Sequence, residues 1–478
     1  MSDNIQVIRA LGQRLPVPER RRLVLLTGAR QTGKTTLARH RYPDLRYINL
    51  DAPENREALR GIASPFWARD VGPAVLDEAQ KEPVIFEKVK FAYDDGSLSF
   101  SVLLGSSQIL LLKKIRETLA GRIAIFELWP LMMSEIFNGG CAVPGVGVMG
   151  DGTLPRPPAG VSQPAAPPLV SAGVSRPASS PLVSAGVSQP ASSISTATVM
   201  PLTPPLVDAL FSAAGCDEIF GNLPEVLLAD DDAPRRRAQD DLLQWGGMPA
   251  LISLTPEERR QWLRDYEYTY LERDVADLAR LDDLMPFRKF QRLAALRSGR
   301  LLNYAELARD AAVSVDTARR YLEYLRLSYQ TFLLPPYHAN LTSTVVKTPK
   351  TYWLDIGLLR HLTGIPEAVT GEFYESMVVG EWVKWMKTMG REGELYFYRT
   401  RSGLEVDVLF ESVAGVVGAE IKARRTLAAR DATGLKEIAA ALGKRWRGGM
   451  VIYAGNELKR IGAPQLWAVP SHRLFTRV

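Results

Sequence analysis

The segment from Leu23 to Thr36 reads L-V-L-L-T-G-A-R-Q-T-G-K-T-T. It begins as an apolar run of strand length and continues as G-x-x-x-x-G-K-T, a pattern typical of a phosphate-binding loop between a buried strand and a helix. Its two glycines allow successive N–H groups to face one anion, and the helix that follows adds the positive end of its dipole. We therefore expect nucleotide phosphates to bind to Gly28, Ala29, Arg30, Gln31, Thr32, Gly33, Lys34, Thr35 and Thr36.

Two carboxylates follow a later apolar run, at Asp77 and Glu78. Strands that alternate with helices predict a parallel sheet covered on both faces, with ligands at the carboxyl ends of its strands. In such a site Lys34 reaches the β- and γ-phosphates, and Thr35 and Asp77 hold Mg²⁺. Glu78 then orients and polarises the water that attacks the γ-phosphate.

Three further side chains are candidates for a role near the γ-phosphate. Ser106 follows a fourth predicted strand, 98–104, and either senses the γ-phosphate or only caps a helix. Arg116 and Arg122 precede a fifth predicted strand, 123–128. Either arginine is a candidate to stabilise transition-state charge, in its own subunit or in a neighbouring one, and the alternative is an ordinary surface arginine.

The residues also carry a family resemblance. The segments G-A-R-Q-T-G-K-T-T, V-L-D-E-A-Q, L-L-G-S-S and L-A-G-R, followed by L-W-P-L and S-E, resemble prokaryotic ATPases of the AAA+ class. The closest likeness is to the subgroup that carries a C-terminal domain of unknown function with a nuclease-like core. This resemblance implies an ATP-binding core at residues 1–138, with ATP and Mg²⁺ as cofactors.

Composition narrows the class of protein further. The chain has 478 residues, 46% of them hydrophobic, which suggests about three domains with packed cores. Its net charge of +6 favours an anionic partner. Cys141 and Cys216 stand far apart without a nearby histidine or cysteine cluster, so we expect free thiols in a reducing cytoplasm rather than zinc or disulfides. No run approaches the ~18 apolar residues that cross a bilayer, so we expect no membrane partner.

The composition changes between residues 139 and 205. This segment is rich in Ala, Pro, Gly, Ser and Val, and the pattern A-G-V-S-x-P recurs there at 159, 172 and 185. It has almost no aromatic residues for a core, and its prolines interrupt regular structure. We expect a flexible insert; a short β-solenoid is the alternative.

The middle of the chain reads as helical, with a lid-like region at 206–285 and a winged helix-turn-helix at 286–345. The G-G-M-P segment at 246–249 resembles a family turn that approaches the base, or is simply a turn that ends a helix. Ser314 caps a predicted helix whose apolar face contains Val315, Ala318, Leu322 and Leu325.

Arginines surround this predicted helix-turn-helix. Arg319 and Arg320 point away from the apolar face, and Arg288, Lys289, Arg292, Arg297 and Arg300 lie upstream with no acidic residue among them. Such a pattern favours contacts to DNA phosphates around a helix in a groove. The alternative is a protein-binding module with a solvated basic face.

The last predicted domain, 346–478, has the order helix, strand, strand, strand, helix. In a strand, residues two apart share a face, so Glu420 and Lys422 point the same way. The pattern resembles the PD-(D/E)xK nuclease core, with Glu375, Asp407 and Glu420 as Mg²⁺ ligands and Lys422 as the group that positions water or neutralises phosphate charge. The residue before Asp407 is Val406, where that core has proline. The alternative is a cluster of ion pairs in a domain that keeps the fold without the chemistry.

Together these patterns predict an α/β protein with a P-loop parallel-sheet ATPase core, a helical and winged-helix middle, and a restriction-endonuclease-like C-terminal domain. The leading hypothesis is ATP hydrolysis coupled to DNA binding or processing, with a homo-oligomer as a further candidate partner state. A nucleotide-switched protein scaffold with an inactive nuclease fold and an ATP-gated nuclease are the two alternatives.

Overall fold

A computed structural model describes residues 7–105, 118–138, 203–270, 284–337, 347–365 and 369–477. The described residues belong to one compact unit of the chain. Within them no helix is long and apolar enough to span a membrane. The predicted flexible insert lies outside the described residues, except for its last three positions, 203–205.

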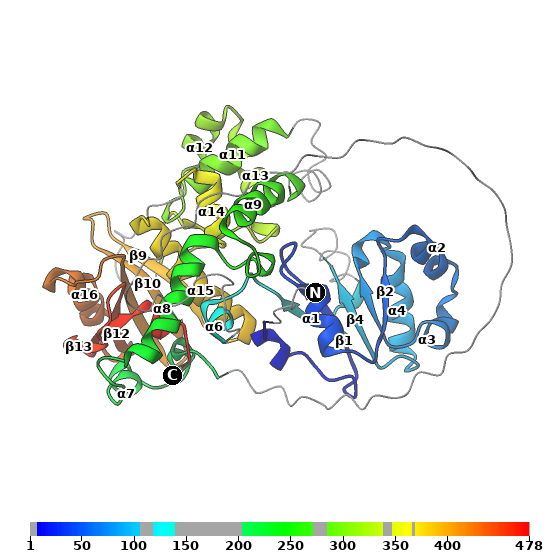
Figure 1. Ribbon diagram of the computed structural model, residues 1–478, viewed down its shortest axis with the longest axis horizontal. Coiled ribbons are helices and arrows are strands. Elements are labelled where there is room, and N and C mark those ends of the chain that lie inside the picture. Colours follow the sequence, from blue (N-terminus) through cyan, green and yellow to red (C-terminus); the bar gives the residue numbers. More distant parts are fainter. Residues whose placement is uncertain are drawn as a thin grey trace, which may run out of the picture. The chain divides into compact units, whose positions relative to one another are not determined.

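The N-terminal region contains a five-stranded parallel sheet, as predicted (Figure 1). The strand order is β2-β3-β4-β1-β5. The strands are β1 (Arg22–Thr27), β2 (Arg46–Asn49), β3 (Ala74–Asp77), β4 (Phe100–Leu104) and β5 (Ile123–Glu127). Because β1 lies between β4 and β5, the phosphate loop leaves the interior of the sheet rather than an edge.

Helices cover both faces of this sheet. They are α1 (Lys34–Arg41), α2 (Pro53–Gly61), α3 (Trp67–Asp70) and α4 (Val84–Asp94). Alternate residues of β1 point to opposite faces, so Val24 and Leu26 pack with α1, while Leu23 and Leu25 pack with α2, α3 and α4. The continuous apolar run in β1 is thereby explained, since both of its faces are buried.

The chain then enters a helical region. Its helices are α6 (Met133–Asn138), η4 (Leu206–Phe211), α7 (Cys216–Phe220), α8 (Ala229–Trp245) and α9 (Pro256–Tyr270). In α9, Tyr266 is buried and stacks on Trp262, which agrees with a packing role for this aromatic residue.

Three helices and a small antiparallel sheet come next. They are α11 (Met285–Ala295), β6 (Arg300–Leu301), α12 (Tyr304–Ala311), α13 (Val315–Leu327), β7 (Thr331–Leu334) and β8 (Lys350–Trp353), with strand order β6-β8-β7. Ser314 caps α13 as predicted, through its side chain and the Thr317 N–H. The prediction for Val315 was wrong: as the first residue of the helix it precedes the packed face and is 39% exposed, whereas Tyr321 is buried instead.

The C-terminal region contains a six-stranded mixed sheet, with strand order β13-β14-β12-β11-β10-β9. Strands β9, β10 and β11 are antiparallel, while β11, β12 and β14 run parallel. The elements are α14 (Ile356–Thr363), α15 (Gly371–Met389), β9 (Glu394–Arg399), β10 (Glu405–Ser412), β11 (Gly415–Lys422), α16 (Thr433–Leu442), β12 (Trp446–Tyr453), β13 (Lys459–Gly462), β14 (Leu466–Pro470) and α17 (Ser471–Leu474).

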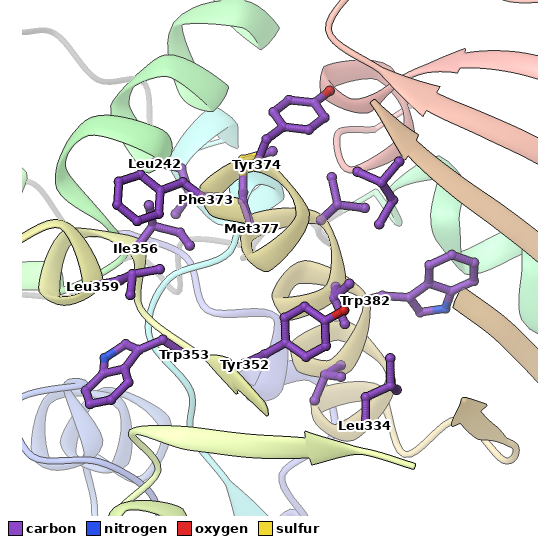
Figure 2. Close-up of a cluster of buried hydrophobic side chains, with 14 of the residues drawn as sticks. Leu242, Leu334, Tyr352, Trp353, Ile356, Leu359, Phe373, Tyr374, Met377 and Trp382 are labelled. Carbon is purple, nitrogen blue, oxygen red and sulfur yellow. The ribbon is translucent and has the colours of Figure 1, made fainter. Parts of the chain in front are cut away.

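One hydrophobic core joins the helical middle to the C-terminal region. Figure 2 shows side chains of α15, including Met377 and Trp382, among residues that precede α15 in the chain, such as Leu242 and Trp353. These residues are almost completely buried. The predicted boundary at residue 346 therefore falls within a shared core.

Backbone segments cross closely at Gly246 and Gly247. A Cβ on Gly246 would lie 2.3 Å from Asp355 Oδ1, and one on Gly247 would lie 2.3 Å from Leu131 O. Asp355 accepts a hydrogen bond from the Gly247 N–H (2.8 Å), and Gly247 O accepts one from the Leu131 N–H (2.6 Å). The G-G-M-P turn thus joins three distant segments, and glycine is required there because any side chain would meet backbone or Asp355.

Candidate nucleotide site and C-terminal acidic cluster

The predicted phosphate loop lies between β1 and α1. Gly33 has a φ of 90° at the start of α1, and a Cβ on Gly28 (φ 147°) would lie 2.1 Å from Leu128 O. Helix α1 has no side-chain N-cap, so the donors of its first turn are directed toward the loop. This is the geometry in which backbone N–H groups hold an anion.

Lys34, Thr35 and Asp77 lie together at the end of the loop. The Lys34 ammonium donates to Gly28 O (3.0 Å) and Ala29 O (2.7 Å), which holds it over the loop. Thr35 Oγ1 donates to Asp77 Oδ2 at 2.7 Å, and the Tyr47 hydroxyl donates to the same oxygen at 2.7 Å. A hydroxyl and a carboxylate in direct contact, beside a cleft of about 530 Å³, fit the ligand pair that a P-loop offers to Mg²⁺.

Glu78 follows in a left-handed conformation, with φ 55° and ψ 42°. Non-glycine residues adopt this conformation at a cost, and it commonly marks a functional position. Burial, and secondarily the neighbouring Asp77 carboxylate, raise the pKa of Glu78. The Gln80 amide donates to Glu78 and fixes the orientation of the carboxylate.

The other candidates near the γ-phosphate have different outcomes. Ser106 and Arg116 lie outside the described residues. Arg122 pairs with Asp94 and precedes β5, whose register places Ile123 beside Leu23 and Glu127 beside Thr27. The phosphate loop follows Thr27 at the carboxyl ends of the strands. Arg122 therefore lies at their amino ends, on the opposite side of the sheet from the loop. A role for Arg122 at its own subunit's phosphates was therefore a wrong prediction, and a role toward a neighbouring subunit stays a prediction.

Arg9 supports the loop from behind, a contact that the sequence did not indicate. Its guanidinium donates to Thr32 O (2.6 Å) and Trp129 O (2.6 Å) and pairs with Glu135 (3.2 Å). Glu135 also accepts from the Ala10 N–H at 2.8 Å. The S-E pair of the family resemblance therefore anchors the segment that holds the loop. Nothing in the residues around Arg9 distinguishes it from other arginines.

A small aromatic cluster connects the loop with the segment after α13. It consists of Ala29, Trp129, Tyr329 and Leu354, all buried. The Trp129 and Tyr329 rings meet edge to face, with centroids 4.9 Å apart. The Tyr329 hydroxyl donates to Glu127 Oε1 at 3.1 Å, and burial raises the pKa of Glu127.

Three of the predicted nuclease residues, Asp407, Glu420 and Lys422, lie near one another in the C-terminal sheet, and Glu375 lies on helix α15. Strands β10 and β11 pair Val408 with Ala419, which brings Asp407 and Glu420 to adjoining positions. Asp407 Oδ2 accepts from the Ile421 N–H at 2.8 Å. Lys422 pairs with Glu420 at 2.6 Å. The predicted grouping of these residues thus has the expected strand geometry.

A lysine that was not predicted lies among these carboxylates. The Lys350 ammonium contacts Glu375 Oε1 (3.0 Å), Glu405 Oε1 (2.6 Å) and Asp407 Oδ1 (3.8 Å). Among the described residues, no group of three acidic, histidine or cysteine side chains is arranged to hold a metal ion. Glu375, Asp407 and Glu420 therefore do not fit Mg²⁺ in this arrangement. The one signal in the sequence was a lysine at the start of the apolar run K-T-Y-W, which becomes buried strand β8.

The charges in this acidic cluster depend on one another. Burial, followed by the nearby Asp407 carboxylate, raises the pKa of Glu375 to about 7 and that of Glu420 to about 8. Burial alone would lower the pKa of Lys350, but Glu375, Asp407 and Glu405 outweigh it and raise that pKa. Lys350 is thus held in its charged form.

The arginines upstream of the helix-turn-helix are paired with acids from elsewhere in the chain. Arg292 lies 3.3 Å from Glu267, Arg297 contacts Glu306 at 2.9 Å, and Arg300 lies 3.4 Å from Glu372. The basic face expected there is therefore partly neutralised. By contrast, Arg319 and Arg320 are exposed on α13, and within the described ranges neither forms an ion pair.

Comparison with protein families agrees with the nucleotide-site geometry. Residues 20–137 match the model described as an AAA domain. The chain therefore carries an AAA-like P-loop ATPase domain. Residues 219–368 match a domain of unknown function (DUF8612), and residues 370–474 match another (DUF4143).

Two curated relatives are each 26% identical over 414 residues, covering 84% of this chain and 71% of theirs. They are uncharacterized proteins from Mycobacterium bovis and Mycobacterium tuberculosis. Among solved structures, the Walker-type ATPase of Pyrococcus abyssi has a TM-score of 0.37 and 13% identity, covering 71% of this chain and 90% of its own. A signal transduction ATPase with numerous domains and a tetratricopeptide repeat sensor, from Pyrococcus horikoshii, has a TM-score of 0.25 and 9% identity, covering 81% and 48%.

Proposed function

We propose that the protein hydrolyses ATP and that the nucleotide state controls the helix-turn-helix formed by α12 and α13, through which the protein contacts DNA. The observation that carries this proposal is the cluster of Ala29, Trp129, Tyr329 and Leu354. It places a residue of the phosphate loop in one buried group with a residue that follows α13 by two positions. A shift of the phosphate loop on binding phosphate would therefore displace residues that pack at the end of α13.

The residues of the nucleotide site have separate roles in hydrolysis. The loop N–H groups and Lys34 bind the phosphates, and Thr35 and Asp77 would hold Mg²⁺, which neutralises phosphate charge when bound. Glu78 orients the attacking water and accepts its proton. Its raised pKa brings it closer to the working pH, which favours general-base catalysis, and Gln80 fixes its carboxylate.

Coupling to the helix-turn-helix runs through Tyr329. Its ring packs on Trp129, and its hydroxyl bonds to Glu127 at the end of β5, the strand beside β1. Its backbone has a φ of 60°, so the turn after α13 is tightly defined. The end of α13 is therefore attached to the parallel sheet by the Tyr329 side chain and not by the backbone connection alone.

DNA is the partner that the exposed residues of α13 favour. The order of helices and strands from α11 to β8 supports a winged-helix module, in which α13 would occupy the position of the recognition helix. Arg319 and Arg320 lie on its exposed face, and the Arg319 guanidinium lies over the Tyr304 ring, 5.4 Å from its centroid. These two arginines are the proposed phosphate contacts.

Steady-state ATP turnover with and without duplex DNA tests the proposal. We expect sustained hydrolysis whose rate changes on adding DNA, and loss of that change in Arg319→Glu/Arg320→Glu with basal hydrolysis retained. Sustained hydrolysis that ignores DNA would favour a protein partner for the helix-turn-helix. A single turnover followed by a stable bound state would favour the nucleotide-switched scaffold.

Of two finer hypotheses, the first belongs to this proposal and the second does not. A homo-oligomer would be required for Arg122 to act at a neighbour's phosphates, and Arg122→Ala tests that in the same ATPase assay. Metal-dependent DNA cleavage by Asp407, Glu420 and Lys422 is not part of the proposal, because the acidic cluster contains Lys350.

A further inference from the structure

We infer that the ammonium group of Lys350 is the resident cation of the C-terminal acidic cluster and takes the place of a divalent metal there. The acidic cluster consists of Glu375, Glu405, Asp407 and Glu420. The inference concerns a site distant in sequence from the phosphate loop, and it does not depend on the proposed ATPase function.

The contacts of Lys350 meet the needs of an ammonium group. Its three donors face oxygens of Glu375 at 3.0 Å, Glu405 at 2.6 Å and Asp407 at 3.8 Å, and the Phe397 ring centroid lies 5.6 Å away. The side chain is only 4% exposed. An ammonium this deeply buried is stable only when carboxylates surround it, as they do here.

The same carboxylates are committed to other donors. Glu375 Oε1 accepts from Tyr352 (2.5 Å) as well as from Lys350, and Asp407 Oδ2 accepts from the Ile421 N–H (2.8 Å). Mg²⁺ requires oxygens at about 2.0–2.1 Å in near-octahedral order, and among the described residues no three acidic, histidine or cysteine side chains are arranged to hold a metal ion. A divalent ion near Lys350 would also meet its positive charge.

Two further cations pair with carboxylates of the acidic cluster. Lys422 pairs with Glu420 (2.6 Å), and Arg399 lies 3.4 Å from the second oxygen of Glu405. With Lys350 these groups supply three positive charges opposite four carboxyl groups, and two of these, Glu375 and Glu420, have raised pKa values. The acidic cluster is thus close to neutral without any ion from solution.

The resident cation comes from a different part of the chain than the carboxylates. Lys350 belongs to β8, within the residues 219–368 that match one family model, whereas the carboxylates lie within residues 370–474, which match another. Strand β8 pairs with β7, which follows α13. The ion pairs therefore also attach the sheet of the helix-turn-helix to the C-terminal domain.

Manganese binding to the full-length protein, followed by electron paramagnetic resonance without nucleotide, tests the inference. Asp407→Asn serves as the reference that neutralises one carboxylate of the acidic cluster and leaves the nucleotide site unchanged. We expect the titrations of wild type and Asp407→Asn to coincide. Wild type binding one more Mn²⁺ than Asp407→Asn would overturn the inference, whether or not any Lys350 variant can be purified.

Variants of Lys350 provide the second arm. Lys350→Met is close to lysine in size but uncharged, and we expect it to bind one Mn²⁺ per chain that wild type does not bind. That gain should disappear in Lys350→Met/Asp407→Asn. Lys350→Arg keeps the charge and should exclude Mn²⁺ as wild type does. A folded Lys350→Met that gains no Mn²⁺ would contradict the inference.

Discussion

Replacing Tyr329 by phenylalanine removes one hydroxyl and keeps the aromatic ring beside Trp129. The lost hydrogen bond, 3.1 Å to the partly buried carboxylate of Glu127, is of a kind that contributes about 1.5–3 kcal/mol. Since about 1.4 kcal/mol is a factor of ten, local opening of this cluster should become about 10- to 100-fold more frequent. Basal ATP hydrolysis should remain, because no residue of the loop is changed.

Hydrogen exchange at the amide of Leu354 measures this opening. That amide donates to Gln330 O (2.9 Å), next to Tyr329, so it exchanges only when the cluster loosens. Tyr324→Phe, on α13 but outside the cluster, is the matched control. An exchange rate in Tyr329→Phe that equals wild type, or a rise equal to that in Tyr324→Phe, would refute the idea that this bond couples the loop to α13.

Three other outcomes are expected. Lys34→Ala should abolish nucleotide binding because it removes the fixed cation opposite the phosphates. Glu78→Gln should bind ATP and hydrolyse it about 100-fold or more slowly, and normal turnover by this variant would exclude Glu78 as the base. Arg319→Glu/Arg320→Glu should weaken DNA binding and reduce its salt slope by about one unit per lost phosphate contact, so an unchanged slope would count against DNA contact by α13. Burial and Asp407 raise the pKa of Glu420 from 4.5 to about 8, so between these pH values the folded chain keeps a proton that the unfolded chain releases. The melting temperature should therefore fall as the pH rises from 5 to 8, and it should fall less in Glu420→Gln.

The nucleotide site was predictable because its parts are short and contiguous in sequence. The phosphate loop is one segment, and Asp77 ends β3, which lies two strands away from β1 in the same parallel sheet, so sheet topology brings Asp77 and the adjacent Glu78 to the same side of the sheet as the loop. Helix α13 was predictable for a similar reason, since Ser314 caps its own helix.

The contacts that were missed join residues far apart in the chain. Lys350 meets Asp407 across 57 positions, and Arg9 meets Trp129 across 120. The hydrophobic periodicity of a sequence gives no information about contacts between residues so far apart. The upstream arginines were misread for the same reason: Arg300, for example, has no nearby acid in sequence, but the fold brings Glu372 to it. The prediction that Arg122 acts at its own subunit's phosphates failed because β5 runs parallel to β1. A residue that precedes β5 therefore lies at the amino ends of the strands, away from the phosphate loop.

The membership of the hydrophobic cores has a consequence for synthesis of the chain. Both cores of the parallel sheet are built from residues between Leu11 and Leu128, whereas the core shown in Figure 2 extends from Ala10 to Phe475. A ribosome that adds about 5–20 residues per second needs roughly 17 to 70 s to travel from Leu128 to Phe475. During that interval the emerging chain carries a folded nucleotide site together with apolar helix faces whose partners do not yet exist. Chaperone capture of the nascent protein should therefore concentrate on the segment around α8.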